Sequence, residues 1–290
     1  MDNEAPALPA AARAAESAVK EVDFGPPSGW LSLRLRELWG YRDLLYFLIW
    51  RDIKVRYKQT LLGAAWAILQ PLMTMVVFSL IFGKLARMPT DGIPYPIFSF
   101  TALLPWQLFS RALSDASSSL VTSQTMITKV YFPRILLPLA SILSGVVDFA
   151  IALVILIGMM FYYRIQPTWA VLTLPLFIVM ALATAMAVGL WLSALNVLYR
   201  DVKYVTPFLI NFWLYATPVA YSSSLIPEGW RSLYGLNPLA GVVEGFRWAL
   251  LGQTLNVGSL IFVSAAAVVV LLVAGLIYFQ RMELTLADMV

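Results

Sequence analysis

Residues 135–163 read ILLPLASILSGVVDFAIALVILIGMMFYY. This stretch is long and apolar enough to cross a bilayer as one helix, and Asp148 is its one charged side chain. A transmembrane helix needs about 20 consecutive apolar residues. The whole chain has this character, because 60% of its 290 residues are apolar and 12% are charged. Soluble domains carry about 25% charged residues and have too little interior to bury so much apolar surface. The sequence therefore predicts an all-α membrane protein and excludes a soluble enzyme, a disordered scaffold and a nucleic-acid-binding domain.

Two residue types that carry much of protein site chemistry are missing, since the sequence contains no cysteine and no histidine. Disulfides, thiolate chemistry, Cys/His metal sites and a Ser-His-Asp triad are therefore excluded. The sequence also lacks a phosphate-binding loop of the form GxxxxGK followed by Ser or Thr, and Gly83-Lys84 is the nearest partial match to this motif. We predict no catalytic residue, no metal site and no cofactor in this chain. Any pumping must draw on another subunit or on an ion gradient.

Apolar runs divide most of the chain into six predicted spans. The second span is the most polar, with Gln107, Arg111 and Asp115, and the fifth is interrupted by Pro207 and Pro218. Most of the 20 lysines and arginines fall before the first span or after the second, fourth and sixth, which predicts that both termini are cytosolic. The six spans are predicted at residues 61–82, 96–120, 135–163, 169–198, 205–221 and 257–279.

Further segments complete the predicted organisation. Residues 1–29, rich in Ala and Pro, are expected to form a disordered cytosolic tail. Residues 30–58 repeat leucines at helical spacing among many charges, which is typical of an amphipathic helix lying at the membrane surface. Residues 59–290 then form the six-span domain. Within it, glycines and prolines divide residues 225–252 into pieces too short to cross, so two short re-entrant or interfacial helices are expected on the outer face.

Polar and aromatic residues inside the predicted spans have two interpretations. Asp148 is either functional, which is the default hypothesis for an intramembrane ionisable residue, or it accepts hydrogen bonds where helices meet. Trp191, Trp213 and Tyr215 either line a path for sugars, whose C–H faces stack on aromatic rings, or simply pack against other helices. These four residues are the channel-lining candidates.

Segments outside the spans also carry candidate roles. Residues 123–133 and 198–205 combine apolar and charged side chains, so each is either an ordinary connector or a docking surface for a soluble partner. Glu244 and Arg247 lie three positions apart and can pair on one helix face. We expect this pair at the outer gate.

Four short motifs occur in order along the chain. They are WRDIKVRYKQT at residues 50–60, KVYFPR at 129–134, NVLYRDV at 196–202, and Asn237-Pro238 followed by Phe246-Arg247. Together they resemble the membrane subunit of type-2 ABC exporters, and most closely the branch that exports O-antigen, capsule and teichoic acid polysaccharides. Each motif is weak by itself, but the four in this order are specific.

The resemblance implies a permease of the bacterial inner membrane with the type-2 ABC exporter fold, in which two copies of a six-span subunit form a homodimer. It implies two ABC ATPase subunits, which hold ATP and Mg²⁺. The cargo would be a polysaccharide on an undecaprenyl-type lipid diphosphate, and the other partners would be membrane lipids. The helix before the first span would be a gate, and the two cytosolic loops would couple to the ATPase. The coupling residues implied are Ser123, Met126, Ile127, Lys129, Tyr131, Phe132, Tyr199, Arg200 and Asp201.

The predicted gate helix carries a basic cluster where a lipid diphosphate would approach from the cytosol. Arginine binds phosphate oxygens bidentately. The same residues would serve equally well to hold anionic lipids and to set topology. The cluster consists of Arg51, Lys54, Arg56 and Lys58.

These features predict the permease subunit of an ATP-driven exporter that moves a lipid-diphosphate-linked polysaccharide out of the cytosol. The first alternative is a type-2 ABC exporter of a small lipid or drug, with the same fold and a narrower path. The second is an ion-coupled carrier, in which Asp148→Asn would abolish transport. The third is a structural assembly subunit that binds a partner and moves nothing.

Overall fold

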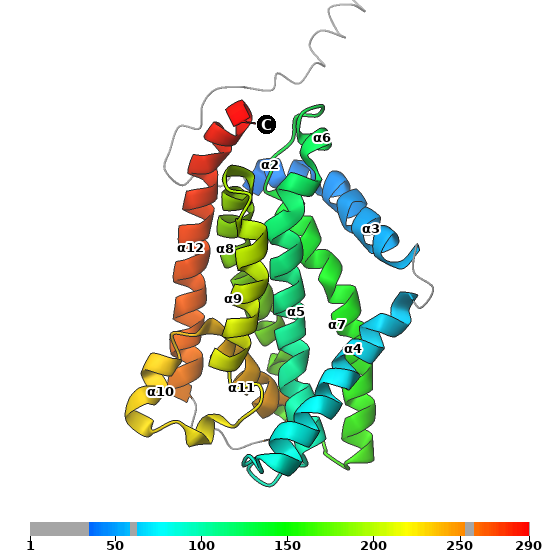
Figure 1. The fold of residues 1–290 in the computed structure, drawn as a ribbon, viewed down its shortest axis with the longest axis vertical. Coiled ribbons are helices and arrows are strands. Elements are labelled where there is room, and N and C mark those ends of the chain that lie inside the picture. The colour runs from blue at the N-terminus through cyan, green and yellow to red at the C-terminus, as the bar shows by residue number, and fades with distance from the viewer. Residues whose placement is uncertain (1–34, 59–62, 253–257, 290) are drawn as a thin grey trace, which may run out of the picture. The chain divides into compact units, whose positions relative to one another are not determined.

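The computed structural model describes residues 35–58, 63–252 and 258–289, and the regular elements of these segments are all helices (Figure 1). The predicted tail at 1–29 and the first residues of the predicted gate helix lie outside the described residues. The elements up to the third predicted span are α2 (Leu35–Gly40), α3 (Arg42–Lys58), α4 (Gly63–Phe78), the π-helical η1 (Ser79–Leu85), α5 (Tyr95–Thr122), α6 (Gln124–Ile127) and α7 (Leu136–Tyr162). The later elements are η2 (Trp169–Thr173), α8 (Leu174–Leu198), α9 (Val202–Ala216), η3 (Ser223–Leu225), α10 (Glu228–Tyr234), α11 (Pro238–Leu251) and α12 (Gly258–Met289).

Four helices among the described residues are long and apolar enough to cross a membrane. They match the first, third, fourth and sixth predicted spans. The second predicted span is α5, which has 28 residues but carries polar and charged side chains along its length. The four helices are Ala65–Leu85, Leu136–Tyr162, Trp169–Leu198 and Ser259–Glu283.

The fifth predicted span, 205–221, is displaced along the chain, because it starts three residues after the beginning of the observed helix and extends five residues past its end. The helix α9 begins at Val202 and ends at Ala216, and its 15 residues reach about 22 Å, less than the thickness of the hydrocarbon core. Pro218 explains the end, because a proline disfavours helical geometry in the residue before it. Thr217 accordingly adopts an extended conformation, with φ −106° and ψ 143°.

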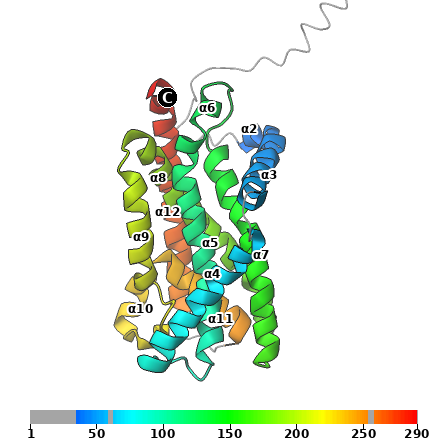
Figure 2. The ribbon, with the colours of Figure 1, turned by 45° about the vertical axis from the view of Figure 1, so that its right-hand side comes forward.

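Helix α5 forms the centre of the bundle. It packs against α7 and α8 over most of its length, and also against α4, α9 and α11. Both views place it between α7 and α9 (Figure 1, Figure 2). Small residues permit this close packing: a Cβ atom on Gly189 of α8 would lie only 3.0 Å from the Cβ of Ala116 on α5.

The predicted gate helix is two helices, since α2 and α3 are separated by a turn at Tyr41. In α3, Leu48 is fully buried and packs with Leu120, Phe132 and Leu136. Tyr46 and Trp50 are among several large α3 side chains that remain exposed. An exposed apolar and aromatic surface on a charged helix suits a position at a membrane interface.

Two short helices, α10 and α11, follow the end of α9, as expected for residues 225–252. They lie at the opposite end of the bundle from α6 (Figure 1). Local sequence explains where α11 begins and ends. The Asn237 side chain accepts a hydrogen bond from the amide of Leu239 at 3.1 Å, Pro238 occupies the first turn, and Gly252 ends the helix with φ +67°.

The contact between α8 and α12 gives a test of this packing. A Cβ atom on Gly275 of α12 would lie 2.5 Å from the carbonyl oxygen of Ala187, whereas a Cβ on Gly158 of α7 would meet nothing within 4 Å. We expect Gly275→Ala to lower the free energy of unfolding by about 1–3 kcal/mol, because the helices must separate. Gly158→Ala is the matched control. Thermal unfolding in detergent that gave equal midpoints for the two variants would contradict the packing described.

Candidate functional site

Arg56, at the end of α3, bonds to carboxylates on two other helices. Its Nη2 donates to Oδ2 of Asp115 on α5 at 2.7 Å, and its Nη1 donates to Oδ2 of Asp148 on α7 at 2.8 Å. Nη1 also donates to the carbonyl of Ser144 at 3.4 Å. One guanidinium therefore joins three helices.

Asp148 receives further donors. Arg111 of α5 approaches its Oδ2 to 3.0 Å, and the Tyr57 hydroxyl donates to its Oδ1. Burial and the neighbouring Asp148 carboxylate raise the pKa of Tyr57 to about 12, so the tyrosine stays protonated and able to donate at neutral pH. We call Arg56, Arg111, Asp115 and Asp148 the Arg56 cluster.

The formal charges of the Arg56 cluster sum to zero, which suits its surroundings. The side chain of Asp148 is 11% exposed and that of Arg56 is 18% exposed. Removing one partner from a buried pair leaves an uncompensated charge, at a cost of about 3–5 kcal/mol. The cluster therefore fixes the end of α3 against α5 and α7. Its helix-contact role is one of the two interpretations of Asp148 derived from the sequence.

Sequence spacing indicates that some members of this cluster lie close together, but it does not indicate that Arg56 joins them. Arg111 and Asp115 are four residues apart on α5, so they share a helix face, as do Ser144 and Asp148 on α7. Arg56, however, is 59 residues from Asp115 and 92 from Asp148. Only the packing of the helices brings it to them.

The predicted basic cluster of α3 is not gathered around one site. Arg56 is bonded to carboxylates, and Arg51 pairs with the adjacent Asp52 at 2.9 Å. Lys54 and Lys58 are exposed. Among these four basic residues, the two lysines are thus the ones whose side chains lie mainly outside the protein packing.

The four channel-lining candidates lie in separate surroundings. Trp191 packs against Tyr278 of α12, with ring centroids 5.6 Å apart, and Trp213 packs edge-on against Phe109 of α5 at 5.1 Å. Tyr215 is exposed on α9, and Asp148 belongs to the Arg56 cluster. Trp191 and Trp213 thus make the packing contacts that were the alternative to a path.

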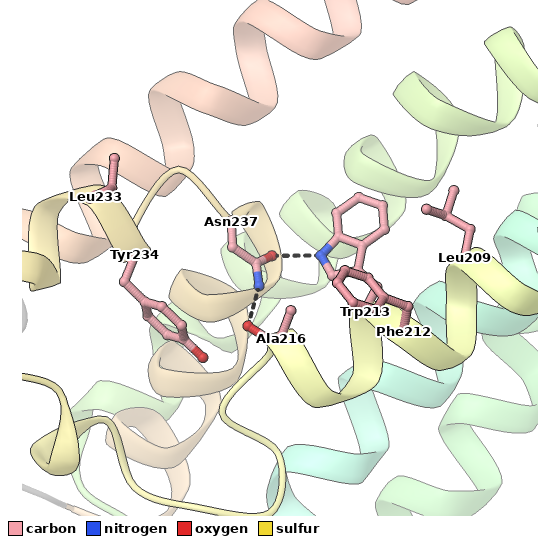
Figure 3. A pocket seen from close by; sticks show the side chains of 7 residues that line it. All are labelled: Leu209, Phe212, Trp213, Ala216, Leu233, Tyr234 and Asn237. Atoms are coloured by element: carbon pink, nitrogen blue, oxygen red, sulfur yellow. Dashed lines mark hydrogen bonds between the residues drawn. The ribbon is translucent and has the colours of Figure 1, made fainter.

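A groove of about 520 Å³ lies between α9 and α10, next to the start of α11 (Figure 3). Its polar side chains are already engaged: Asn237 Oδ1 accepts from Trp213 Nε1 at 2.9 Å, and Asn237 Nδ2 donates to the carbonyl of Ala216 at 3.0 Å. The groove therefore offers mainly apolar and aromatic surface. It is lined by Leu209, Phe212, Trp213, Ala216, Leu233, Tyr234 and Asn237.

The residues predicted for coupling lie at one end of the bundle, where α6, the connection from α8 to α9 and the end of α12 are found (Figure 1). Most of them are exposed or half-buried. Phe132 is the exception, because it is buried among α3, α5 and α7 and anchors the loop from inside. Arg134 also holds this loop, since its amide and its Nη1 donate to Glu283 of α12 at 3.2 and 3.3 Å. The exposed members are Lys129, Tyr131, Tyr199, Arg200 and Asp201, and the half-buried ones are Ser123, Met126 and Ile127.

The predicted pair of Glu244 and Arg247 is confirmed. Arg247 Nη1 donates to Glu244 Oε1 at 2.8 Å, and both side chains are fully buried. The arginine also donates to the carbonyls of Val219 and Tyr221, each at 3.1 Å, and its guanidinium lies 3.7 Å from the centroid of the Phe98 ring. The arginine thereby donates hydrogen bonds to backbone carbonyls that lie beyond the end of α9, where the chain is not helical.

Other side chains complete this arrangement, and little in the sequence pointed to them. The Tyr95 hydroxyl donates to the carbonyl of Ala220 at 2.7 Å, and the Ser222 hydroxyl donates to Asp91 at 2.6 Å. Asn237 was detectable as a helix cap before a proline, but its bond to the carbonyl of Ala216 was not.

Comparison with known proteins identifies the chain at the level of a family. Residues 43–251 match the sequence profile described as ABC-2 type transporter. The chain belongs to the ABC-2 type transporter family. This match confirms the resemblance found in the four motifs. As an ABC-2 family member the chain is a multi-pass membrane protein and a transport component.

Individual relatives of this ABC-2 chain match along almost their entire lengths. The O-antigen export system permease protein RfbA of Myxococcus xanthus is 33% identical over 253 residues, which cover 86% of this chain and 96% of the relative. A protein of the same name from Klebsiella pneumoniae is 28% identical, with 89% and 99% covered. The polysialic acid transport protein KpsM of Escherichia coli is 23% identical, with 83% and 94% covered.

The buried pair at Arg247 generates a stability prediction. Arg247→Met leaves the Glu244 carboxylate buried without its cation, so we expect the free energy of unfolding to fall by about 3–5 kcal/mol. Adding Glu244→Gln should recover part of this loss, because it removes the unpaired charge. Arg87→Met is the control: Arg87 is exposed, so its removal should change the free energy of unfolding by about 0.5 kcal/mol or less. Unfolding in detergent that ranked the two single variants equally would contradict the assignment.

Proposed function

We propose that this chain is the membrane-spanning permease subunit of an ATP-driven exporter that moves a lipid-linked polysaccharide from the cytosol across the bacterial inner membrane. The observation that carries the proposal is the similarity to an O-antigen export permease at 33% identity over 96% of that protein's length. The cargo is anchored on a lipid diphosphate of the undecaprenyl type. This chain supplies the path and forms no covalent bond with the cargo.

Energy comes from two copies of a separate ABC ATPase. The absence of a nucleotide-binding loop from the sequence supports this division of labour. The ATPase docks at the end of the bundle that carries α6 and residues 199–203, where Lys129, Tyr131 and Tyr199 are exposed. In this proposal that end of the bundle, together with both chain termini, lies in the cytosol.

Two copies of the chain form a homodimer with the path between them. Support comes from α9, whose exposed aromatic side chains Tyr204, Phe208, Phe212 and Tyr215 recur every three or four residues along the helix. Aromatic faces suit the C–H faces of sugar rings. The buried Glu244–Arg247 pair holds the outer closure of this path.

The lipid diphosphate meets the exposed Lys54 and Lys58 of α3 at the cytosolic surface. Arg56 and Arg51 contribute less to this encounter because their charges are already balanced by aspartates. Lysine binds phosphate as a point charge and needs no fixed geometry, which suits a transient contact at the membrane surface.

An exporter of a small lipid is the second candidate function. The groove between α9 and α10 favours it, because the polar atoms of Asn237 and Trp213 are already hydrogen-bonded and leave an apolar surface for an acyl chain. Substrate choice separates the two candidates. A lipid exporter moves a phospholipid and is indifferent to a glycan on the lipid.

Reconstitution with the partner ATPase tests the proposed function. Proteoliposomes that contain the wild-type complex should move a lipid-diphosphate-linked polysaccharide when ATP is added. A complex whose ATPase subunit has lost its catalytic carboxylate should move no more than protein-free vesicles, because this chain has no energy source of its own. The matched substrate is a fluorescent phospholipid without a glycan. Export that continues without ATP hydrolysis, or that moves only the phospholipid, would refute the proposal.

A further inference from the structure

We call residues 123–135, which join α5 to α7, the α6 loop; three members of the Arg56 cluster lie on these two flanking helices and Arg56 itself lies on α3. Helix α5 leads into this loop and carries Asp115 about two turns before its end at Thr122. Helix α7 leaves the loop at Leu136 and carries Asp148. Because Arg56 is bonded to both carboxylates, α3 is attached at once to the two helices that flank the loop, about two turns from it on α5 and about three turns from it on α7.

A second contact ties α3 to the same unit. Leu48, fully buried and about two turns before Arg56 on α3, packs with Leu120 at the end of α5 and with Phe132 inside the loop. The apolar contact of Leu48 and the ion pairs of Arg56 both lie on α3, and both join it to the unit formed by α5, α7 and the loop between them. Fixing a helix at two points restrains its rotation as well as its position.

The ion pairs of the Arg56 cluster are costly to break. Asp148 accepts bonds from Arg56 and Tyr57 and pairs with Arg111, so its charge has three donors around it. Withdrawing Arg56 would leave the two carboxylates of Asp115 and Asp148 with Arg111 as the one remaining cation of the cluster. A contact that is costly to open is suited to carry motion from one element to another.

We propose that α3 moves as one rigid body with the α6 loop, and that Arg56 is the positioning residue that makes it do so. This inference rests on the proposed function, in which the ATPase displaces that loop. Movement of α5 and α7 then carries α3 along and changes the cytosolic approach to the path. Arg56 does not touch the cargo; it transmits the displacement.

The functional test compares ATP hydrolysis with export in the reconstituted complex. Arg56→Met should leave hydrolysis close to the wild-type rate and lower polysaccharide export by about tenfold or more, so that ATP is spent without transport. Arg42→Met is the matched control, because Arg42 lies on the same helix and pairs with its own neighbour Asp43. It should leave both rates unchanged. Export by Arg56→Met at the wild-type rate would overturn the proposal.

A measurement on an otherwise wild-type chain covers the case in which Arg56→Met fails to fold. The natural sequence has no cysteine, so Tyr46→Cys on α3 and Val154→Cys on α7, both exposed side chains, give two unique sites for spin labels. Labelled subunits are diluted with unlabelled ones to isolate distances within one subunit. The distance distribution should be the same without nucleotide and with the ATP-bound state trapped. A shift on ATP binding would overturn the rigid-body proposal.

The two tests also separate this inference from the proposed function. A wild-type complex that fails to export polysaccharide contradicts the proposed function. A wild-type complex that exports, with an Arg56→Met variant that exports equally well, contradicts only the role of Arg56.

Discussion

A guanidinium among apolar helices has to find its counter-charges inside the protein, and Arg56 finds two of them on two different helices. This requirement explains much of the arrangement around it. It brings the end of α3 onto α5 and α7, and it uses the only carboxylate in the apolar run from 135 to 163. The Arg56–Asp148 pair is largely buried and therefore costly to break, although an apolar replacement of the same shape would be about equally stable. Its value therefore lies in specifying which helices meet.

At the other end of the bundle, backbone polar groups likewise need partners inside the protein. There the chain leaves helix α9 at Ala216, and its carbonyl groups need donors that a helix would have supplied. Arg247 of α11, Asn237 at the start of the same helix and Tyr95 of α5 supply them. An irregular segment near the membrane is thus stabilised by side chains, and Glu244 balances the arginine that does most of this work.

The sequence predicted the features that depend on local spacing. Hydropathy located α7 to within one residue at each end, and the span predicted at 169–198 covers η2 and α8, because a long apolar run admits one structure in a bilayer. The Glu244–Arg247 pair followed from a spacing of three residues on one helix. The end of α9 was misplaced because Pro218 acts through the conformation of its neighbour, which an average over hydropathy does not register.

Contacts between distant residues could not be predicted in this way. Arg56 was predicted either to meet a lipid phosphate or to hold anionic lipids and set topology, yet its partners in the structure are aspartates that only the tertiary packing brings near. Trp213 was predicted either to line a path or to pack against other helices; its ring packs against Phe109 and its indole N–H donates to Asn237. In both cases the residue type was identified correctly as important, and the partner required the fold.

The most direct measurement of the central claim is a double-mutant cycle between Arg56 and Asp148. The free energies of unfolding of the wild type, Arg56→Met, Asp148→Asn and the double variant are compared in the same detergent or bilayer. If the two side chains are paired across α3 and α7, the coupling energy is about 1–3 kcal/mol. Additive effects, with a coupling within about 0.3 kcal/mol of zero, would contradict the account, because residues that do not interact add in this way.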